Sequence, residues 1–444
     1  MLVEAEDEVG GAARSLALTL PGFVHDIGAA ITPLAIASPF MRTVPLEQFG
    51  IEWVYPPLPV AHPIEGSRSA YLDQSLQKTA AGLGVDAKRY LQLIRPLVAD
   101  WEKLAPAILG PPRPRRHPLA LGRFGVMATW PSTWMIRSMF EGENARALMA
   151  GFAAHSVLPL DAMGTSAFVF LFAVTGHTTG WPFPRGGMQT LSNGLARYFE
   201  SLGGEIVTGT RIKSLAELPS AKSVLLDLSP TQIDEIAGNA LPDGYRSRLR
   251  RYRHGPGVFK LDYALSGLVP WTAPEAALAG TVQVGGTLSE VAGSEQLVAR
   301  GGHPERPFVL VAQQSRFDSS RAPDGKHTLW AYCHVPNGSS FDMTDRIEAQ
   351  IERFAPGFRD VVLSRHILAP ADLQRMDANL IGGDIAGGAQ SLWRILFRPV
   401  MSLNPYVTPK PGLYICSAST PPGGGVHGMC GYWAARAALK RDGI

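Results

Sequence analysis

The sequence predicts a mixed α/β protein in which two domains are interleaved along the chain. Strand-like and helix-like segments alternate over residues 181–230 and again over 413–440, which is typical of a sheet covered by helices. Over residues 257–335 strand-like segments follow one another with long loops, which predicts a mostly antiparallel sheet. A chain of 444 residues is also too long for one hydrophobic core, so about two or three domains are expected.

The elements at the start of the chain follow from local patterns. The apolar residues before Glu4 read as the end of a buried strand, and a loop with Gly10 and Gly11 comes next. From about residue 70 to 155 the pattern is helical. The apolar run 169–174 is expected to be buried, and the proline-rich segment 111–118 is expected to cross the surface.

Later segments give sharper expectations. A helix should follow Gly187 and end at Gly203 and Gly204, and residues 205–212 should form a strand. A helix over 344–358 is predicted to begin with a capping box of Asp345 and Glu348. The apolar face of the first of these helices consists of Leu191, Leu195, Phe199 and Leu202.

The α/β pieces lie apart in the sequence but should meet in space. We therefore expect residues 1–40, 185–235 and 380–444 to form one domain, and residues 41–184 and 236–379 to form the other.

Composition excludes several classes of protein. The net charge of +3 is small for this length and argues against a nucleic-acid partner. The three cysteines form no CxxC pair and their odd number argues against a disulfide framework, so a reducing, cytoplasmic setting is expected. The longest apolar run, 167–174, is far shorter than the ~20 residues of a membrane-spanning helix. Peripheral contact with lipid stays open, and the oligomeric state is not predicted.

Glu4 and the residues after it form the first candidate site. A carboxylate at a strand tip can accept two hydrogen bonds from a ribose diol. Gly10 and Gly11 would let backbone N–H groups approach a pyrophosphate, and Arg14 could neutralise its charge, with Ser15 beside it. The same residues could also be an acidic surface turn.

The segment TPPGGGVHGMCG near the C-terminus is the stronger candidate. It places glycines at 423, 424, 425, 428 and 431 ahead of or at the start of a helix, although a simple turn needs only one or two. A helix N-terminus favours negative charge, such as that of a reduced flavin. His427 lies inside this segment, where it could act in proton transfer or anchor the backbone.

Other chemistry finds little support in the sequence. No HExxH, GxSxG or GxxxxGK[ST] motif occurs, and no histidines have metal-ligand spacing, so no metal site is predicted. His25 and Asp26 are adjacent and would face opposite sides of a strand, which argues against a catalytic couple. The glycine-rich segments 184–191 and 382–388 could approach a ligand closely or be ordinary turns.

Taken in order, EAEDEVGGAARS, PFPRGGMQTLSNGLA and GLYICSASTPPGGGVHGMCGYWAARAAL resemble the phytoene-dehydrogenase-like flavoproteins. Within the family, the sequence resembles the branch that contains pyridine nucleotide-disulfide oxidoreductase domain-containing protein 2, and GGDIAGGAQSLWRILFRP adds to the likeness. The resemblance implies a Rossmann-like FAD-binding domain, an interleaved substrate domain of antiparallel sheet and helices, and an amine-oxidase/phytoene-desaturase-like architecture. It also implies FAD as cofactor and hydride transfer from a small apolar substrate to flavin N5, in desaturation or isomerisation.

The resemblance also implies roles for individual residues. Glu4 would hold the adenosine ribose, and Ile212 would contact adenine through its backbone. No certain catalytic base is implied, so His427 is only a candidate. The pyrophosphate and ribityl chain would lie along Gly10, Gly11, Arg14 and Ser15, and the flavin edge along Gly424, Gly425, Val426, His427, Gly428 and Met429.

This chain departs from the family pattern at one place. The family begins with a strand and a GxGxxG helix, whereas this sequence starts inside the next strand, so the FAD-binding domain reads as N-terminally truncated. We expect the natural protein to be longer, which mass spectrometry of the native protein would test; a mature N-terminus at Met1 would contradict it. Two alternatives remain: a flavin-free relic with a binding or regulatory role, and a flavin amine oxidase.

Overall fold

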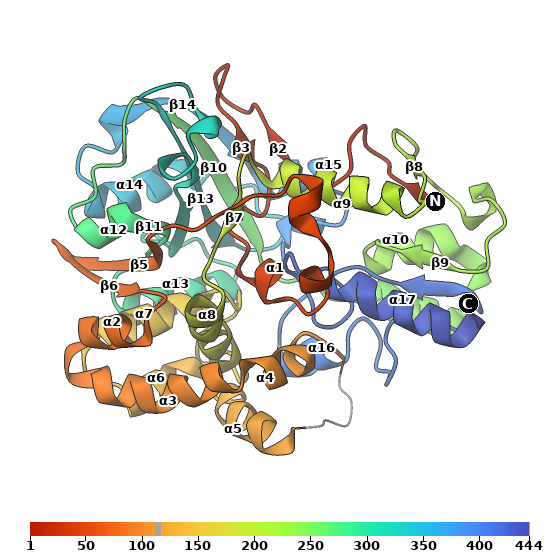
Figure 1. Cartoon of the computed structure of the whole chain (residues 1–444), viewed down its shortest axis with the longest axis horizontal. Coiled ribbons are helices and arrows are strands. Elements are labelled where there is room, and N and C mark those ends of the chain that lie inside the picture. The colour runs from red at the N-terminus through yellow and green to blue at the C-terminus, as the bar shows by residue number, and fades with distance from the viewer. Residues whose placement is uncertain (112–116, 444) are drawn as a thin grey trace.

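The computed structural model describes residues 1–111 and 117–443. Its largest element is a seven-stranded sheet with the strand order β14-β10-β13-β12-β11-β5-β6 (Figure 1). Every neighbouring pair is antiparallel except β11 and β5. The mostly antiparallel sheet predicted from residues 257–335 is therefore confirmed. Its strands are β5 (Leu58–Glu65), β6 (Arg68–Leu72), β10 (Gly257–Leu265), β11 (Ala279–Val284), β12 (Val309–Ala312), β13 (His327–Val335) and β14 (Val362–Leu368).

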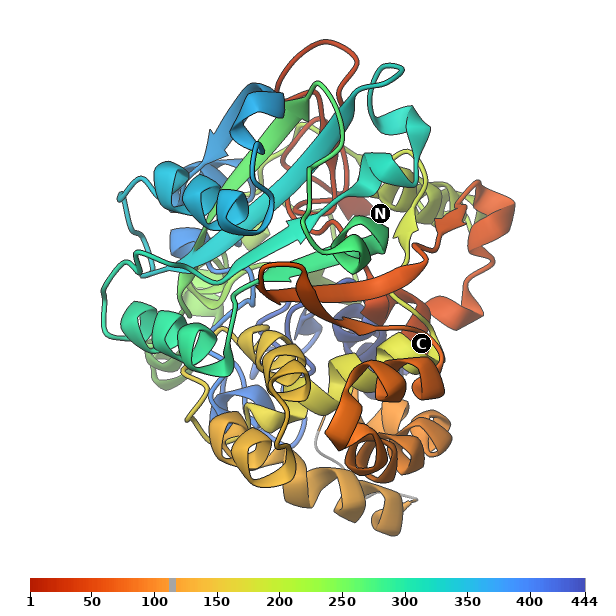
Figure 2. The same cartoon turned by 90° about the vertical axis from the view of Figure 1, so that its left-hand side faces the viewer.

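Helices cover one face of this sheet, and a buried apolar cluster fills the space between (Figure 2). The cluster includes Val258, Leu310 and Trp330 from the strands and Phe170 from the helices. The predicted helical region 70–155 lies here. Its helices, with two later ones that pack on them, are α2 (Leu76–Gly82), α3 (Ala87–Ala99), α4 (Trp101–Ile108), α5 (Pro118–Ala128), α6 (Ser132–Met139), α7 (Glu143–Ala154), α8 (Ser166–Thr178) and α13 (Leu288–Ala299).

The other face of the sheet packs on α14 (Thr344–Phe354) and α12 (Pro274–Leu278). Ile347, Ile351 and Phe354 of α14 are buried in a second apolar cluster with strand residues. The predicted capping box at the start of α14 is wrong. Asp342 accepts the hydrogen bond from the Thr344 N–H instead (2.8 Å), and buried Glu348 forms ion pairs with Arg359 and Arg365.

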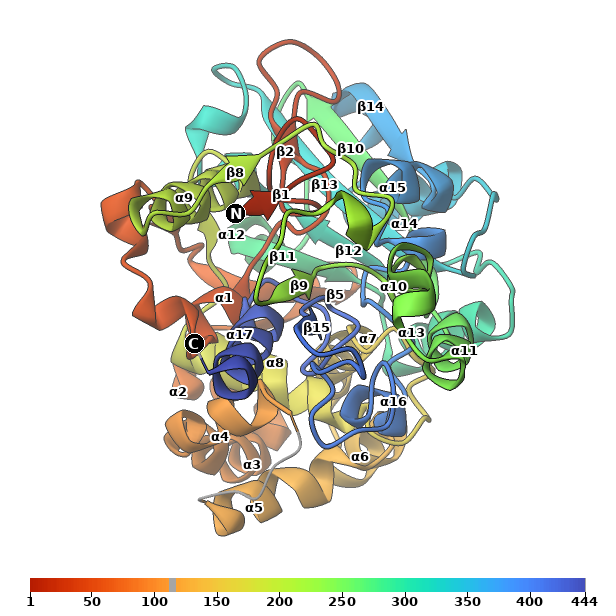
Figure 3. The same ribbon diagram turned by 90° about the vertical axis from the view of Figure 1, so that its right-hand side faces the viewer.

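Parallel strand pairs join the three segments that were assigned to the first domain. Residues of β1 (Leu2–Val3) pair with β8 (Ile206–Val207), and β9 (Val224–Leu226) pairs with β15 (Leu413–Ile415) (Figure 3). The two pairs are separate sheets rather than one continuous sheet. This pairing agrees with the expected interleaving, although the domain boundaries themselves stay a prediction.

The remaining elements surround these pairs. α17 packs beside β15 through Tyr414 and Ala434, and α10 and α11 pack on β9 through Ile233 and Leu249. Two short antiparallel pairs complete the sheets: β2 (Ser15–Leu16) with β3 (His25–Asp26), and β4 (Trp53–Val54) with β7 (Phe183–Pro184). The helices are α1 (Pro33–Ala37), α9 (Met188–Ser201), α10 (Pro230–Ala237), α11 (Asp243–Arg250), α15 (Pro370–Met376), α16 (Leu392–Leu396) and α17 (Met429–Asp442).

Several local predictions can be compared with these elements. The run 169–174 is helical and mostly buried, but Leu171 and Phe172 are only partly buried. The strand predicted over 205–212 is limited to Ile206–Val207, because Gly209 and Thr210 turn back to bond Glu6 and Glu4. The surface crossing predicted for 111–118 lies mostly outside the described residues. None of the described helices is long and apolar enough to cross a membrane.

Candidate active site

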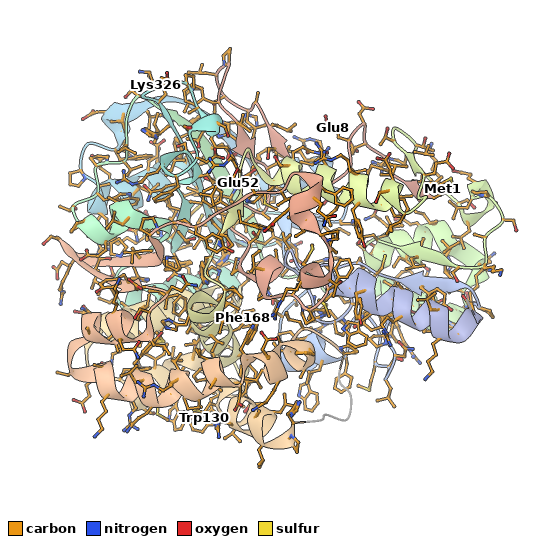
Figure 4. All side chains as sticks on the ribbon, viewed as in Figure 1. Met1, Glu8, Glu52, Trp130, Phe168 and Lys326 are labelled. Carbon is orange, nitrogen blue, oxygen red and sulfur yellow. The ribbon has the colours of Figure 1, made fainter. Side chains whose placement is uncertain are left out.

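One large cavity runs through the interior between the strand pairs, the seven-stranded sheet and the helices. Its volume is about 2220 Å³, which exceeds the roughly 300–1,000 Å³ of sites for single small molecules. It extends from Met1 near the β1–β8 pair to Phe168 on α8, both labelled in Figure 4. The cavity therefore has room for a dinucleotide and a further ligand.

The open edges of β1 and β9 form one end of the cavity. The N–H groups of Leu2 and Glu4 donate to Glu205 and Val207 (2.7 and 2.8 Å), so the backbone groups of Val3 face away from β8. The side chains of Leu2 and Leu225 are 40% and 38% exposed, which is high for apolar strand residues. These edges and side chains line the cavity.

Three carboxylates gather at the ends of these strands: Glu4, Asp227 and Asp377, all of which line the cavity. Asp227 is exposed at the cavity, and partial desolvation together with the charges of Asp377 and Glu4 raises the pKa of its carboxyl to about 6. Burial likewise raises the pKa of Asp377. At neutral pH this end of the cavity is acidic, so a hydroxyl-bearing group such as a ribose fits better here than a bare anion.

We expect the raised pKa of Asp227 to make the free energy of unfolding fall as the pH rises. Because the folded-state pKa lies above the unfolded value, this contribution is complete at low pH and is lost as the pH passes 6. Asp227→Asn should therefore melt at a higher temperature than the wild type at pH 7, with a smaller difference at pH 5. Melting temperatures measured across this range test the prediction. Asp324→Asn, which changes an acid outside the cavity wall, is the control, and an equal pH dependence in all three proteins would contradict the prediction.

Most of the predicted cofactor residues line this cavity. Arg14, Ser15 and Met429 do not. The Arg14 side chain is bound to the carbonyl oxygens of Gly11 and Met376 (2.9 and 2.8 Å), and Ser15 donates to Asp26 (2.6 Å). The cofactor roles of Arg14 and Ser15 stay predictions, and in the structure both side chains form hydrogen bonds to other parts of the protein. The predicted residues in the wall are Glu4, Gly10, Gly11, Ile212, Gly424, Gly425, Val426, His427 and Gly428.

The glycine-rich loop before α17 is tightly packed, partly against its own chain. A Cβ on Gly428 would lie 2.6 Å from the Phe40 ring, and a Cβ on Gly424 would lie 3.0 Å from Ala386. Gly425 has φ +128°, a conformation that L-residues rarely adopt. Gly428, the residue that precedes α17, lines the cavity, whereas the Met429 N–H at the start of the helix is bound by the His427 ring.

His427 anchors this loop. Its ring is neutral, because burial lowers the pKa to about 4. Nε2 donates to the Gly423 carbonyl oxygen (3.1 Å), and Nδ1 accepts from the Met429 N–H (3.0 Å). Both ring nitrogens are thus bound to backbone, as the anchoring alternative requires, and neither is free for a substrate proton.

The other two glycine-rich segments also contact other parts of the protein. A Cβ on Gly187 would lie 2.3 Å from Ser15 Oγ, so the close approach expected there is toward the chain itself. In the segment 382–388, buried Asp384 accepts from the N–H groups of Gly255 and Ala386 (both 2.8 Å). The residues after it, Ile385 and Ala386, line the cavity.

Several wall residues were not predicted from the sequence. Lys260 of β10 lines the cavity, is 1% exposed and pairs with buried Asp262. Trp330 and Tyr332 of β13 lie beside it with ring centroids 5.0 Å apart. Charged residues two apart on an otherwise apolar strand lie on one face, so the pattern VFKLDYAL carried a signal for this pair.

The residues present fit a flavin dinucleotide in three respects. The cavity has the volume, Glu4 stands at a strand tip for a ribose, and Gly425 and Gly428, which come before α17 and carry no side chain, let a cofactor edge approach the positive end of that helix. Among the described residues no cluster of three or more His, Cys, Asp or Glu side chains could hold a metal ion.

Comparison of sequences supports this interpretation. The sequence model of the flavin containing amine oxidoreductase family matches residues 1–234. The chain is 28% identical over 362 residues to pyridine nucleotide-disulfide oxidoreductase domain-containing protein 2 of Rattus norvegicus, covering 72% of this chain. The chain spans only 62% of that relative's length. It is 25% identical over 357 residues to phytoene desaturase (lycopene-forming) of Pantoea ananas, covering 73% of this chain and 69% of that protein.

Solved structures show the same fold. An oxidoreductase from Methanosarcina mazei superposes with a TM-score of 0.67 at 15% identity, covering 99% of this chain and 93% of that one. A putrescine oxidase superposes with a TM-score of 0.61 at 16% identity, covering 100% and 93%. The predicted mixed α/β architecture of the amine-oxidase type is therefore confirmed. Because the family match spans 234 of the 444 residues, the chain belongs to the flavin-containing amine oxidoreductase family of FAD-dependent oxidoreductases.

Proposed function

We propose that the protein transfers a hydride from a small apolar substrate to FAD, in desaturation or isomerisation. The observation that carries the proposal is the continuity of the cavity. Nine of the twelve predicted cofactor residues line one part of it, and apolar side chains of the sheet and of α8 line another. Bound FAD would supply the acceptor for a hydride from one substrate carbon, while the neighbouring carbon loses a proton to water and the double bond forms.

The chain's own residues would bind and orient the two molecules. Glu4 would accept hydrogen bonds from a ribose, and the N-terminus of α17 would face the anionic edge of the cofactor. Val258, Leu310 and Phe172 would hold the substrate through apolar contacts. Such positioning supplies much of the rate enhancement where no side chain must take a proton.

Amine oxidation is the second candidate, because aromatic rings of Trp330 and Tyr332 line the cavity. Lys260 already places its ammonium 5.7 Å from the centroid of the Trp330 ring, which makes the position less favourable for a cationic amine. Anaerobic bleaching of the flavin separates the candidates, since a polyene should bleach it under the first and an alkylamine under the second.

We also propose a reducing, cytoplasmic setting. Cys333, Cys416 and Cys430 are all free thiols. Burial raises the pKa of Cys430 to about 11, so this thiol stays protonated and unreactive in such a setting.

The visible spectrum tests the proposal directly. We expect purified protein to show flavin absorption, or to gain it on addition of FAD. Gly425→Ala should bind FAD about tenfold more weakly, since strain at such a φ costs about 1–3 kcal/mol. Gly431→Ala is the matched control, because a Cβ there meets nothing within 4 Å. Folded wild-type protein that stays colourless after addition of FAD would support the flavin-free alternative and refute the proposal.

A further inference from the structure

A buried chain of polar side chains lies behind the cavity wall and ends at the cavity. Gln283 of β11 connects His62 of β5 with His155, the residue after α7. Gln283 Oε1 lies 3.4 Å from His62 Nδ1, and Gln283 Nε2 lies 3.0 Å from His155 Nε2. His62 and Gln283 are both completely buried. Gly151 of α7 makes room for them, since a Cβ there would lie 1.9 Å from Gln283 Oε1.

The position of the proton on His62 is fixed by its other nitrogen. Nε2 lies 2.8 Å from the carbonyl oxygen of Gly286, which can only accept a hydrogen bond, so Nε2 carries the hydrogen. Burial lowers the pKa of His62 to about 4, so the ring is neutral and Nδ1 has only a lone pair.

That lone pair determines the orientation of the Gln283 amide. His62 Nδ1 needs a donor, and the amide nitrogen is the donor within reach once the amide makes a half-turn that exchanges its oxygen and nitrogen. The amide oxygen then faces His155 Nε2, which must carry a hydrogen to bond it. In the opposite orientation the His62 ring would need a hydrogen on both nitrogens, as a cation in a fully buried position.

His155 therefore presents the lone pair of Nδ1. The residue lines the cavity, and its ring lies against Phe172 and Trp181 with centroids 4.5 and 5.8 Å away. Within the described part of the chain, Nδ1 has no hydrogen-bond partner. A strong acceptor thus lies in an aromatic part of the wall.

A second unpartnered polar group lies nearby. Thr281 precedes Gln283 by two residues on the same face of β11, roughly 7 Å away along the strand. Its Oγ1 is buried without a hydrogen-bond partner among the described residues, although Thr281 lines the cavity. The Thr281 hydroxyl can donate a hydrogen bond, whereas His155 Nδ1 can only accept one.

We propose that this part of the cavity binds a hydroxyl group carried by the apolar substrate. The ligand O–H donates to His155 Nδ1, and the ligand oxygen accepts from Thr281 Oγ1. A hydroxyl satisfies both, whereas a carbonyl or an ether cannot donate to His155. Identifying the ligand as the substrate rests on the proposed function, but the polarity of the site does not.

The tautomer can be tested without flavin or ligand. In long-range proton–nitrogen spectra of histidine-labelled protein, we expect His155 to show a protonated Nε2 and an unprotonated Nδ1, assigned by the signals missing from His155→Phe. A protonated Nδ1 would overturn the proposal, because the site would then present a donor to the ligand.

Binding of a matched pair of probes tests the ligand class. Wild-type protein should bind 2-naphthol about fivefold more tightly than 2-methoxynaphthalene, as expected for one hydrogen bond. His155→Phe should abolish this preference and Thr281→Val should reduce it. His303→Phe, which alters a histidine stacked on Phe341 outside the cavity wall, should leave it unchanged. Equal binding of both probes by the wild type would refute the hydroxyl site, whereas absence of flavin would refute only the proposed function.

Discussion

Replacing Asp26 with alanine is expected to lower the free energy of unfolding by about 3–5 kcal/mol, because it leaves a buried cation without its partner. Asp26 and Arg321 are each 1% exposed, and Arg321 Nη2 donates to Asp26 Oδ2 (2.7 Å). The carboxylate also accepts from Ser15 Oγ, the Met188 N–H and Gln314 Nε2 (2.6, 2.8 and 3.1 Å). One side chain thus connects β2, the start of α9 and two later loops. Urea denaturation of wild type and variant measures the loss.

The control for this prediction is an ion pair on the surface. Arg42 Nη1 donates to Glu102 (2.7 Å), but the side chains are 49% and 71% exposed. Glu102→Ala should cost about 0–1 kcal/mol, because water screens the pair. Since typical domains are stable by only about 5–15 kcal/mol, the Asp26 variant should unfold at a clearly lower urea concentration. A loss as small as that of the control would show that the buried pair does not stabilise the fold.

The sequence predicted part of this arrangement. It predicted that His25 and Asp26 do not form a couple, and in the structure the two side chains have different partners: His25 Nε2 lies 2.7 Å from Thr19 Oγ1, while Asp26 accepts from Arg321. It could not predict Arg321 as the partner. The two residues are 295 positions apart, and a local sequence pattern contains no information on a contact between residues so far apart in the chain.

The strands of the large sheet also differ in whether the sequence predicted them. β10 and β13 are long, mostly apolar segments and were recognisable as strands, whereas β5 was not. Pro59 and Pro63 lie inside β5 and lack the N–H that a ladder needs, so the segment does not read as a strand. Tertiary pairing with β6 and β11 outweighs this local preference.

The sequence predicted those parts of the candidate site that depend on backbone conformation alone. Gly424, Gly425 and Gly428 of the loop before α17 line the cavity, and their sequence pattern fixes where side chains are absent. The direction of the Arg14 side chain was not predictable, since the Met376 carbonyl that binds it lies on a distant segment. The apolar face of α9 shows the same limit: Leu191 is buried, but Leu202 is 69% exposed because the helix ends at Ser201.

Lys260 and Asp262 should behave as one unit in a double-mutant cycle. Lys260→Met leaves the Asp262 carboxylate buried without a cation, and Asp262→Leu leaves the Lys260 ammonium without an anion. Removing one partner of such a pair costs about 3–5 kcal/mol, whereas replacing both with apolar residues is about neutral. The double variant should therefore be more stable than the Lys260→Met variant by several kcal/mol. Urea denaturation of the four proteins gives the coupling energy.

Burial is the reason that the coupling should be large. Burial lowers the pKa of Lys260 and raises that of Asp262, and each charge opposes the shift of the other. The pair Arg68 and Glu143, with N–O 3.2 Å and side chains 50% and 42% exposed, provides the matched cycle, in which water should limit the coupling to about 1 kcal/mol or less. Since Lys260 lines the cavity, the double variant also makes that wall apolar. Equal coupling in both cycles would mean that Lys260 and Asp262 are solvated in the folded protein, and the cavity wall beside them would then be wet rather than apolar.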